Sequence, residues 1–339
     1  MTRTRISLVA TVLNEYGSLP AWIDGLKNQT RYPDECIVVD GGSSDGTLEL
    51  LEAVEMPFPL KVISAPSVNI STGRNIAISS AVGEIVVVTD AGTVAETNWI
   101  DLLVRPFEAD CSTDLVAGFF EPQAGTFWTR TLGATTLPDA SEINHDLFLA
   151  SSRSFAFRRG WFDWGFQYPE WLDYCEDVVF DLLVRRAGAR QICETGAVVR
   201  FSPRGGAISF VRQYYRYARG DGKAGLFLRR HLVRYGTYIV ALAVLCRRRP
   251  IELAIASLAG MAYLRSPIIR YRQRYPQRST ASDLARAIPL MAVQRFIGDV
   301  AKMAGYPAGL LWRNRKDGMF RFWKTGWRSR RPDGSLPGA

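Results

Sequence analysis

The chain has 339 residues, of which 47% are hydrophobic, so it is long enough for one large domain with an appendage or for two domains, with ample chain for a buried core. Its charge is unevenly spread: residues 1–199 hold 14 Lys and Arg against 27 Asp and Glu, whereas residues 200–339 hold 28 against 6. Two histidines and five scattered cysteines without a CxxC pair argue against a zinc cluster and for a reducing compartment.

Apolar, β-branched runs alternate with segments of helical spacing in the first part of the chain. The predicted strands cover residues 6–13, 35–39, 61–64 and 85–89, and the predicted helices cover residues 18–28, 48–54 and 72–81. Further along, a helix is expected near residues 99–107, a strand near 115–119 and another over 151–157. Strands that alternate with helices predict a parallel, doubly wound α/β sheet.

Acidic residues follow three of these predicted strands, namely Glu15, Asp40 and Asp90. Ligands bind open α/β sheets at the carboxyl ends of the strands. A carboxylate there can accept hydrogen bonds from ribose hydroxyls or from a base N–H, or help to hold a divalent cation beside a diphosphate. Arg74 would supply the fixed positive charge that such a ligand needs. The alternatives are an ordinary turn after a core strand for Asp90 and a surface arginine for Arg74.

The segment over residues 40–47 is rich in small residues and precedes a predicted helix, so it is a candidate phosphate cradle. It has neither the GxGxxG spacing of a dinucleotide-binding fold nor the GxxxxGK[ST] spacing of a P-loop. The sequence therefore supports neither of these two nucleotide-binding folds.

Four motifs follow one another at residues 11–15 (TVLNE), 38–47 (VVDGGSSDGT), 73–75 (GRN) and 89–92 (TDAG). In this order they resemble the nucleotide-sugar half of family 2 glycosyltransferases with the GT-A fold. The resemblance covers roughly residues 5–230 and implies a doubly wound, mixed sheet of the GT-A type. It also implies which residues bind the nucleotide sugar: Thr11, Asn14, Glu15, Asp40, Arg74 and Asp90.

The chain departs from the family pattern at Gly92, where the second acid of the DxD motif is expected. In the family this motif reaches the ribose and a metal ion. The resemblance therefore implies a divalent cation, Mg²⁺ or Mn²⁺, held by Asp90 together with the diphosphate. The glycine leaves the dependence on metal open.

Glu176 and Asp177 precede an apolar run of helical spacing, so they lie at a predicted helix N-terminus, where unpaired N–H groups favour an anion. A Glu-Asp pair at such a place can be an ordinary helix cap. The resemblance instead makes Asp177 the catalytic base and gives Glu176 the task of positioning the acceptor or the loop. Inverting transfer needs such a base, because the acceptor hydroxyl loses its proton as it attacks the anomeric carbon.

Gln213, Arg216 and Tyr217 resemble the Q/RxxRW element of the family, with tyrosine in place of tryptophan. In processive members that element touches the acceptor chain or the diphosphate. A spacing of three and four residues places the three side chains on one face of a helix. The alternative is an amphipathic helix that packs its aromatic residues and exposes its arginines to water.

Two apolar runs, residues 238–246 and 251–264, lie on either side of Arg247-Arg248-Arg249-Pro250. Each is shorter than the roughly 20 residues that a spanning helix needs. Two interpretations stay open: a pair of marginal transmembrane helices, or a hairpin in the bilayer surface whose arginines meet anionic headgroups. A further helix is expected over residues 284–304. The basic, aromatic sequence near the C-terminus could also bind nucleic acid, but no nucleic-acid motif accompanies it.

The predicted organisation is a GT-A glycosyltransferase domain over residues 1–230, a basic, apolar, membrane-associated helical region over 231–331 and a disordered tail over 332–339. The chain is predicted to lie at the cytoplasmic face of the inner membrane, peripherally or with two short apolar helices inserted. There it would move a sugar from a nucleoside diphosphate sugar to a hydroxyl of a glycolipid or cell-envelope polysaccharide, without a nucleic-acid partner. The alternatives are a catalytically inactive scaffold of a polysaccharide assembly complex and a nucleotidyltransferase.

Overall fold

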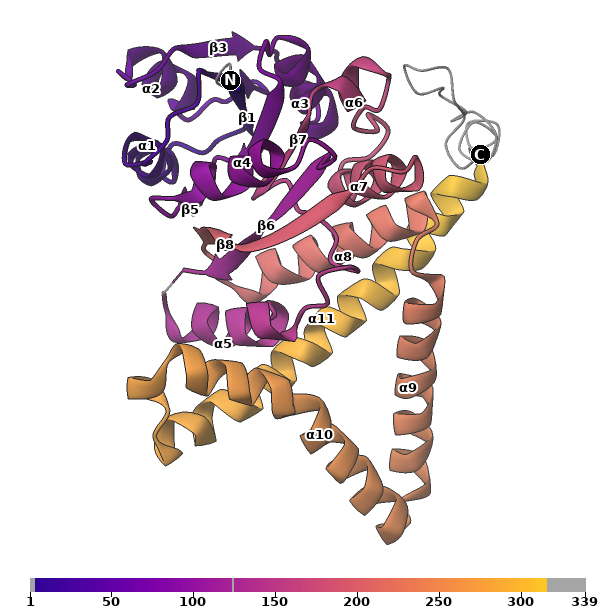
Figure 1. Ribbon diagram of the computed structural model, residues 1–339. Coiled ribbons are helices and arrows are strands. Elements are labelled where there is room, and N and C mark those ends of the chain that lie inside the picture. Colours follow the sequence, from indigo (N-terminus) through magenta and orange to yellow (C-terminus); the bar gives the residue numbers. More distant parts are fainter. Residues whose placement is uncertain (1–3, 124, 316–339) are drawn as a thin grey trace. The chain divides into compact units, whose positions relative to one another are not determined.

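The computed structural model describes residues 4–123 and 125–315 (Figure 1). Within this range the chain forms two compact units. The first comprises residues 4–121 and 140–201, and the second comprises residues 122–139 and 202–315. The predicted disordered tail and the basic, aromatic sequence beyond residue 315 lie outside the described residues. Residue 230, the predicted domain boundary, falls inside the second unit, and the domain limits stay a prediction.

The first unit contains an eight-stranded sheet in the order β3-β2-β1-β4-β7-β6-β8-β5. Four neighbouring strands are parallel: β1 (Ile6–Val12), β2 (Glu35–Asp40), β3 (Leu60–Ser64) and β4 (Ile85–Asp90). The other four are β5 (Thr93–Ala95), β6 (Leu115–Pro122), β7 (Phe155–Arg158) and β8 (Gln191–Phe201). Antiparallel pairing joins β4 to β7, β7 to β6 and β5 to β8. The expected mixed sheet is therefore confirmed.

Helices cover both faces of this sheet. Leu8 and Val9 of β1 are adjacent and fully buried, and they belong to two different apolar clusters because successive strand residues point to opposite faces. The cluster of Leu8 includes residues of α1 (Leu19–Lys27), α2 (Thr47–Ala53) and α4 (Trp99–Ala109). The cluster of Val9 includes residues of α3 (Ile70–Ser79), α6 (Gly160–Asp163) and α7 (Glu176–Arg186). This two-sided burial explains why the central strands are continuous apolar runs.

The register of the central strands determines which residues meet at the edge of the sheet. Thr11 of β1 pairs with Asp90 of β4, and Val12 pairs with Asp40 of β2. The carboxyl ends of the three strands therefore lie side by side, as ligand sites in open α/β sheets require. The chain then turns at once into β5, whose Thr93 hydroxyl donates to the carbonyl of Asp90 at 2.7 Å.

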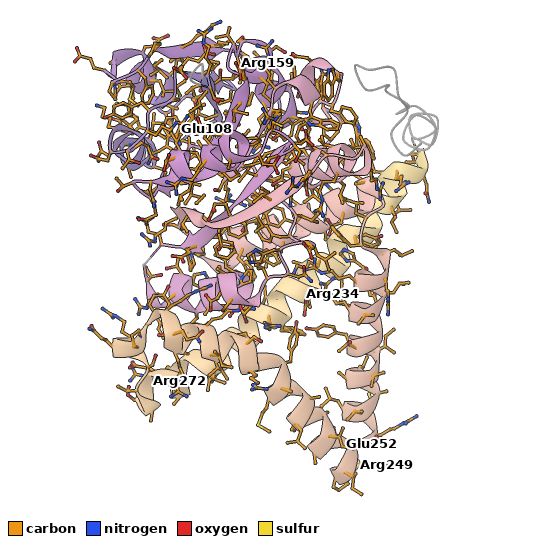
Figure 2. All side chains as sticks on the ribbon, in the orientation of Figure 1. Glu108, Arg159, Arg234, Arg249, Glu252 and Arg272 are labelled. Atoms are coloured by element: carbon orange, nitrogen blue, oxygen red, sulfur yellow. The ribbon has the colours of Figure 1, made fainter. Side chains whose placement is uncertain are left out.

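The second unit is helical. A short 3-10 turn, η1 (Ala140–Glu142), comes directly after residue 139 and belongs to the first unit. The second unit contains α5 (Phe127–Thr136), α8 (Ala207–Ala224), α9 (Leu228–Arg247), α10 (Pro250–Arg274), the 3-10 turn η2 (Pro276–Arg278) and α11 (Ala281–Arg315). Helices α8 and α11 pack closely, because a Cβ built at Gly305 would lie 2.2 Å from the carbonyl oxygen of Tyr215. The α9–α10 hairpin consists of two helices that diverge from a shared end, where Arg249 and Glu252 lie (Figures 1 and 2).

The two predicted apolar runs lie in α9 and α10, and the predicted helix over residues 284–304 lies within α11. Many large apolar side chains of the α9–α10 hairpin are exposed, among them Ile239, Val240, Leu242, Ile255 and Leu258. Of the helices formed by residues 4–123 and 125–315, none is both long and apolar enough to cross a membrane.

Candidate active site

Asp40 ends β2 and is 1% exposed, so its carboxylate lies inside the edge of the sheet. One oxygen, Oδ2, accepts the backbone N–H groups of Gly42 (2.9 Å) and Ser43 (3.0 Å). The other oxygen, Oδ1, is buried and has no hydrogen-bond partner within the described part of the chain. Because a buried acceptor without a partner costs free energy, Oδ1 is an atom at which a ligand N–H would be stabilised.

The loop after β1 is fixed to the loop after β2. The side-chain oxygen of Asn14 accepts the backbone N–H of Ser44 (2.9 Å), and the N–H of Glu15 donates to the hydroxyl of Thr47 (2.9 Å). Asn14 has a left-handed backbone with a φ of 55°, which asparagine tolerates better than most residues. A Cβ built at Gly92 would lie 3.6 Å from Oε2 of Glu15. Three of the predicted motifs therefore converge at this edge.

Arg74 lies in α3 and is 2% exposed, so it is not the surface arginine that the sequence alone allowed. Its NH1 group is 2.6 Å from Oε1 of Glu176, and its NH2 group is 2.7 Å from Oδ1 of Asp90. Burial acts to lower the pKa of Arg74, but the charges of Asp90 and Glu176 more than compensate and raise it. Gly73 lets this part of α3 approach β1, because a Cβ there would lie 3.0 Å from Cγ2 of Thr11.

Glu176 and Asp177 begin α7 in different surroundings. Glu176 is 6% exposed and is paired with Arg74; burial and the charge of Asp177 raise its pKa, against the effect of Arg74. Asp177 is half-buried, and its Oδ2 lies 3.5 Å from the hydroxyl oxygen of Ser151 and 3.4 Å from the backbone nitrogen of Ser152. A substrate hydroxyl can therefore reach Asp177 more readily than Glu176. The assignment of Asp177 as the base stays a prediction.

Asn75 supports the site, a role that the sequence analysis did not assign. Its side-chain amide donates to the carbonyl of Tyr168 and accepts the N–H of Tyr168, both at 2.9 Å. The ring of Tyr168 lies 5.3 Å from the guanidinium carbon of Arg74. This pair of hydrogen bonds fixes the segment before α7 to α3. The signal was present in the GRN motif, because an amide side chain can satisfy a backbone N–H and C=O together.

Arg153 also belongs to the site and was not predicted. Its Nε lies 3.8 Å from Oδ2 of Asp90, its NH1 group donates to the hydroxyl of Ser151 (3.2 Å), and its side chain is 25% exposed. It therefore lies between Asp90 and Ser151, whose hydroxyl faces Asp177. The sequence offered no signal for it, because only the pairing of β4 with β7 brings residue 153 to this place.

Among the described residues, Asp90 is not part of a cluster of three or more His, Cys, Asp or Glu side chains that could hold a metal ion. Both oxygens of Asp90 already face guanidinium groups, Oδ1 that of Arg74 and Oδ2 that of Arg153. Position 92, where a second acid would stand, is a glycine. The predicted Mg²⁺ or Mn²⁺ stays a prediction.

The Q/RxxRW-like residues lie in α8 of the second unit. Gln213 and Tyr217 occupy one face of this helix, where the Gln213 amide donates to the Tyr217 hydroxyl at 2.8 Å. The predicted contact of Gln213, Arg216 and Tyr217 with the acceptor or the diphosphate stays a prediction.

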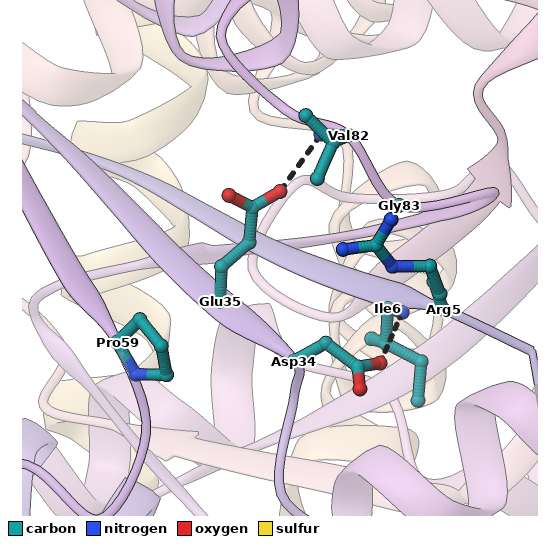
Figure 3. Close-up of a pocket in the computed structure, with 7 residues that line it drawn as sticks. All are labelled: Arg5, Ile6, Asp34, Glu35, Pro59, Val82 and Gly83. Atoms are coloured by element: carbon teal, nitrogen blue, oxygen red, sulfur yellow. Dashed lines mark hydrogen bonds between the residues drawn. The ribbon is translucent and has the colours of Figure 1, made fainter.

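A pocket of about 210 Å³ lies at the opposite ends of β1 and β2 (Figure 3). Its carboxylates serve the fold, since Asp34 accepts the N–H of Ile6 (2.8 Å) and Glu35 accepts that of Val82 (2.7 Å). It contains none of the predicted site residues, and we do not consider it the active site.

Comparison with known proteins finds similarity to glycosyltransferases. The family model described as Glycosyl transferase family 2 matches residues 7–165. Cholesterol galactosyltransferase of Borreliella burgdorferi is 30% identical over 117 residues, which are 34% of this chain and 32% of that protein. The O-antigen chain rhamnosyltransferase RfbN of Salmonella typhimurium is 25% identical over 209 residues, 58% of this chain and 66% of that protein. The chain thus matches about a third and just under two thirds of these relatives.

Two solved structures resemble the fold. The mannosyltransferase PcManGT from Pyrobaculum calidifontis, in complex with GDP-Man and Mn²⁺, is 19% identical with a TM-score of 0.52, covering 94% of this chain and 88% of that one. TarS 1–349 of S. aureus, in complex with UDP, is 15% identical with a TM-score of 0.50, covering 98% and 95%. These likenesses confirm the expected GT-A fold. The match of residues 7–165 to the family model confirms the predicted resemblance to family 2 glycosyltransferases over this part of the chain.

Proposed function

We propose that this chain is a glycosyltransferase that moves a sugar from a nucleoside diphosphate sugar to an acceptor hydroxyl, with inversion at the anomeric carbon. The observation that carries the proposal is the bridge made by Arg74, which is 2.7 Å from Asp90 and 2.6 Å from Glu176. This bridge joins a residue expected to bind the donor to the Glu-Asp pair expected to supply the base. Donor and acceptor would therefore meet at one group of side chains.

The nucleotide base would be recognised at Asp40, whose Oδ1 is buried without a partner among the described residues. An ionised carboxylate only accepts hydrogen bonds. Uracil and thymine offer a ring N–H at N3 and guanine offers one at N1, whereas cytosine and adenine have acceptors at those ring positions. We therefore expect a uridine, thymidine or guanosine diphosphate sugar. UDP and GDP-Man, bound in the two similar structures, are consistent with this expectation.

Asp177 would be the general base of the reaction. Its carboxylate would take the proton of the acceptor hydroxyl as that oxygen attacks the anomeric carbon, while the bond from the carbon to the diphosphate breaks on the opposite side. Such a single in-line displacement inverts the anomeric carbon. Glu176, which pairs with Arg74, would keep the first turn of α7 in place so that Asp177 faces the acceptor. Gln213, Arg216 and Tyr217 would contact the acceptor or the diphosphate.

The acceptor is proposed to be a hydroxyl of a glycolipid or cell-envelope polysaccharide. Two relatives are named a cholesterol galactosyltransferase and an O-antigen chain rhamnosyltransferase, names that refer to a lipid and to a polysaccharide. A lipid or lipid-linked acceptor would lie in a bilayer or at its surface. A transferase for such an acceptor would be expected to bind a membrane surface.

The α9–α10 hairpin supports this membrane role. Leu242 and Ile255 are 63% and 61% exposed, and exposed apolar surface of this kind marks a site of protein or membrane contact. Three consecutive arginines, residues 247–249, lie where the two helices meet, and arginines are attracted to anionic headgroups. We propose peripheral attachment at the cytoplasmic face of the inner membrane, with the apolar sides of α9 and α10 in the headgroup region.

The proposal is tested by nucleoside diphosphate release from a panel of UDP-, GDP- and dTDP-sugars, with membrane lipid extract as the source of acceptor. Wild type is compared with Asp177→Asn, and each reaction is run with Mn²⁺, with Mg²⁺ and with EDTA. Wild type should release diphosphate from one donor, and Asp177→Asn should be slower by about 10²–10⁴-fold, the usual contribution of a general base. The EDTA reactions test the predicted divalent cation.

The matched control is Asp24→Asn, which removes the same charge from an exposed residue of α1. This variant should retain wild-type activity, and both variants should melt at the wild-type temperature. If Asp177→Asn is as active as wild type, Asp177 is not the base. If wild type releases diphosphate from no donor while a nucleotide still binds, the inactive scaffold is favoured instead.

A further inference from the structure

The departing diphosphate of a nucleotide sugar gains negative charge as its bond to the sugar breaks, so it needs positive groups beside it. In this chain Gly92 removes one of the acids that would hold a cation, and the oxygens of Asp90 face Arg74 and Arg153 instead. The site therefore holds Arg153, beside the expected Arg74, where the family pattern leads one to expect a second acid and a cation. The two arginines differ in what they can reach.

Arg74 is 2% exposed, and its NH1 and NH2 groups are taken up by Glu176 and Asp90 at 2.6 and 2.7 Å. Arg74 therefore fixes the positions of Glu176 and Asp90 and has little surface left for a ligand. Arg153 is 25% exposed and lies 3.8 Å from Asp90, a longer and weaker pairing. A ligand in front of Asp90 would thus meet Arg153 before it met Arg74.

Arg153 is also held in place. Its guanidinium carbon is 4.7 Å from the ring centroid of Phe201, the last residue of β8, and its NH1 group donates to Ser151 at 3.2 Å. Contacts of this kind restrict a long side chain before a ligand binds, so less conformational entropy is lost on binding. A guanidinium can also donate two parallel hydrogen bonds to a phosphate.

We propose that Arg153 binds the diphosphate of the donor and stabilises it as it leaves, in the place of a cation held by a second acid. This inference rests on the proposed function. As the bond from the anomeric carbon to the diphosphate oxygen breaks, its electron pair stays on that oxygen. Arg153 keeps its protons and only donates hydrogen bonds, and the proton of the acceptor hydroxyl goes to Asp177. The step needs no further reactant.

If Arg153 had only a structural role and held β8 through Phe201, its substitution would not change the ratio of diphosphate to nucleoside affinity. Four variants separate the two roles. Arg153→Gln removes the charge, whereas Arg153→Lys keeps the charge without the planar fork. Phe201→Leu removes the stacked ring and keeps the arginine. Arg105→Gln is the matched control, because Arg105 is an exposed arginine of α4 paired with Asp101.

Binding is measured by calorimetry, in EDTA and for wild type also with Mn²⁺ in its place, for UDP, GDP and dTDP and for uridine, guanosine and thymidine. Wild type should bind one diphosphate more tightly than its nucleoside. Arg153→Gln should weaken the diphosphate by about tenfold to a hundredfold and leave the nucleoside unchanged, because only the hydrogen bonds to a charged group are lost. Arg153→Lys should lie between, Phe201→Leu should weaken the diphosphate less than Arg153→Gln does, and Arg105→Gln should bind as wild type within about threefold.

The inference is overturned if Arg153→Gln keeps the wild-type ratio of diphosphate to nucleoside affinity. It is also overturned if wild type prefers the diphosphate only when Mn²⁺ replaces EDTA, since a cation would then carry the charge. A wild-type protein that binds none of the six compounds would contradict the proposed function itself. Melting temperatures of all variants identify any that fail to fold.

Discussion

Two carboxylates share Arg74, and this sharing brings together residues that are far apart in the sequence. Arg74 comes from α3, Asp90 from the end of β4 and Glu176 from the start of α7. A buried charge is tolerated only when it is paired and hydrogen-bonded. Loss of the charge of any one of the three residues would therefore leave the charge of another without its partner. The motif around Arg74 was visible in the sequence, but its pairing with Glu176 follows only from the fold.

Asp181 is a second buried carboxyl group of α7, one turn after Asp177, and none of the proposed steps uses it. It is fully buried, and Arg185 is 3.7 Å away. Burial raises the pKa of Asp181 to about 7, although the charge of Arg185 opposes this. A carboxyl group that holds its proton more tightly in the folded state favours folding fully below its unfolded pKa, and this contribution is lost as the pH rises through about 7.

We predict that Asp181→Asn stabilises the protein at high pH. Its amide has no proton to lose, so the variant should melt higher than wild type at pH 8, and the advantage should vanish near pH 4. The gain at pH 8 is about 4 kcal/mol at most, at about 1.4 kcal/mol for each pKa unit. Thermal unfolding from pH 4 to pH 8 measures it, with the exposed Asp24→Asn as the control. An equal difference between the curves at every pH would contradict the prediction.

At the scale of elements, α8 and α11 depend on glycine at their contact. A Cβ at Gly305 would lie 2.2 Å from the carbonyl oxygen of Tyr215, a distance that forces the helices apart. We predict that Gly305→Ala destabilises the protein by about 1–3 kcal/mol, the usual cost of overpacking. Gly260→Ala is the control, since a Cβ at that position of α10 meets nothing within 4 Å.

Gly260→Ala should be neutral or stabilise the helix by up to about 1 kcal/mol, because alanine has the higher helix propensity. The opposite directions of the two substitutions separate packing from propensity. Denaturant unfolding of both variants beside wild type measures the difference. Equal and small effects would mean that α8 and α11 adjust to an added methyl group at no cost.

The parallel strands were predictable because each is a buried apolar run that ends in a polar residue. The predicted strand over residues 35–39 is β2 (Glu35–Asp40), and that over 85–89 is β4 (Ile85–Asp90). β5 (Thr93–Ala95) was not predicted, because three residues are too few for a periodic pattern and its partner, β8, lies far along the chain. α5 (Phe127–Thr136) was also not predicted, because its threonines and Gly133 have weak helix propensity.

The candidate site was predictable to the extent that it consists of strand ends. A parallel sheet places Asp40 and Asp90 at the same edge, and the structure pairs them with Val12 and Thr11 on either side of β1. Arg153 was not predictable, because it follows from the antiparallel addition of β7 to β4. Sequence periodicity identifies buried faces, whereas the neighbours of a strand are fixed by the fold as a whole.

At the scale of the whole molecule, the chain separates its charges, with acidic residues in excess before residue 200 and basic residues after it. The proposed membrane role combines this basic charge with the exposed apolar side chains of the α9–α10 hairpin, and the two contributions respond differently to salt. Attraction between arginines and anionic lipids is screened by salt. Burial of apolar side chains in the headgroup region is not weakened in this way.

We predict that the protein sediments with vesicles of phosphatidylcholine and phosphatidylglycerol, and less with phosphatidylcholine alone. Replacing arginines 247–249 by glutamine should weaken binding to the anionic vesicles by about 100-fold at low salt, from about 1 kcal/mol for each arginine. Leu242→Ser with Ile255→Ser should weaken binding at every salt concentration. Ile208→Ser, at a 77% exposed residue of α8, is the control and should bind as wild type. If the wild type sediments with neither vesicle, the membrane role is wrong. The exposed apolar face of the hairpin would then be expected to contact another partner, such as a second protein, because an uncovered apolar surface favours aggregation.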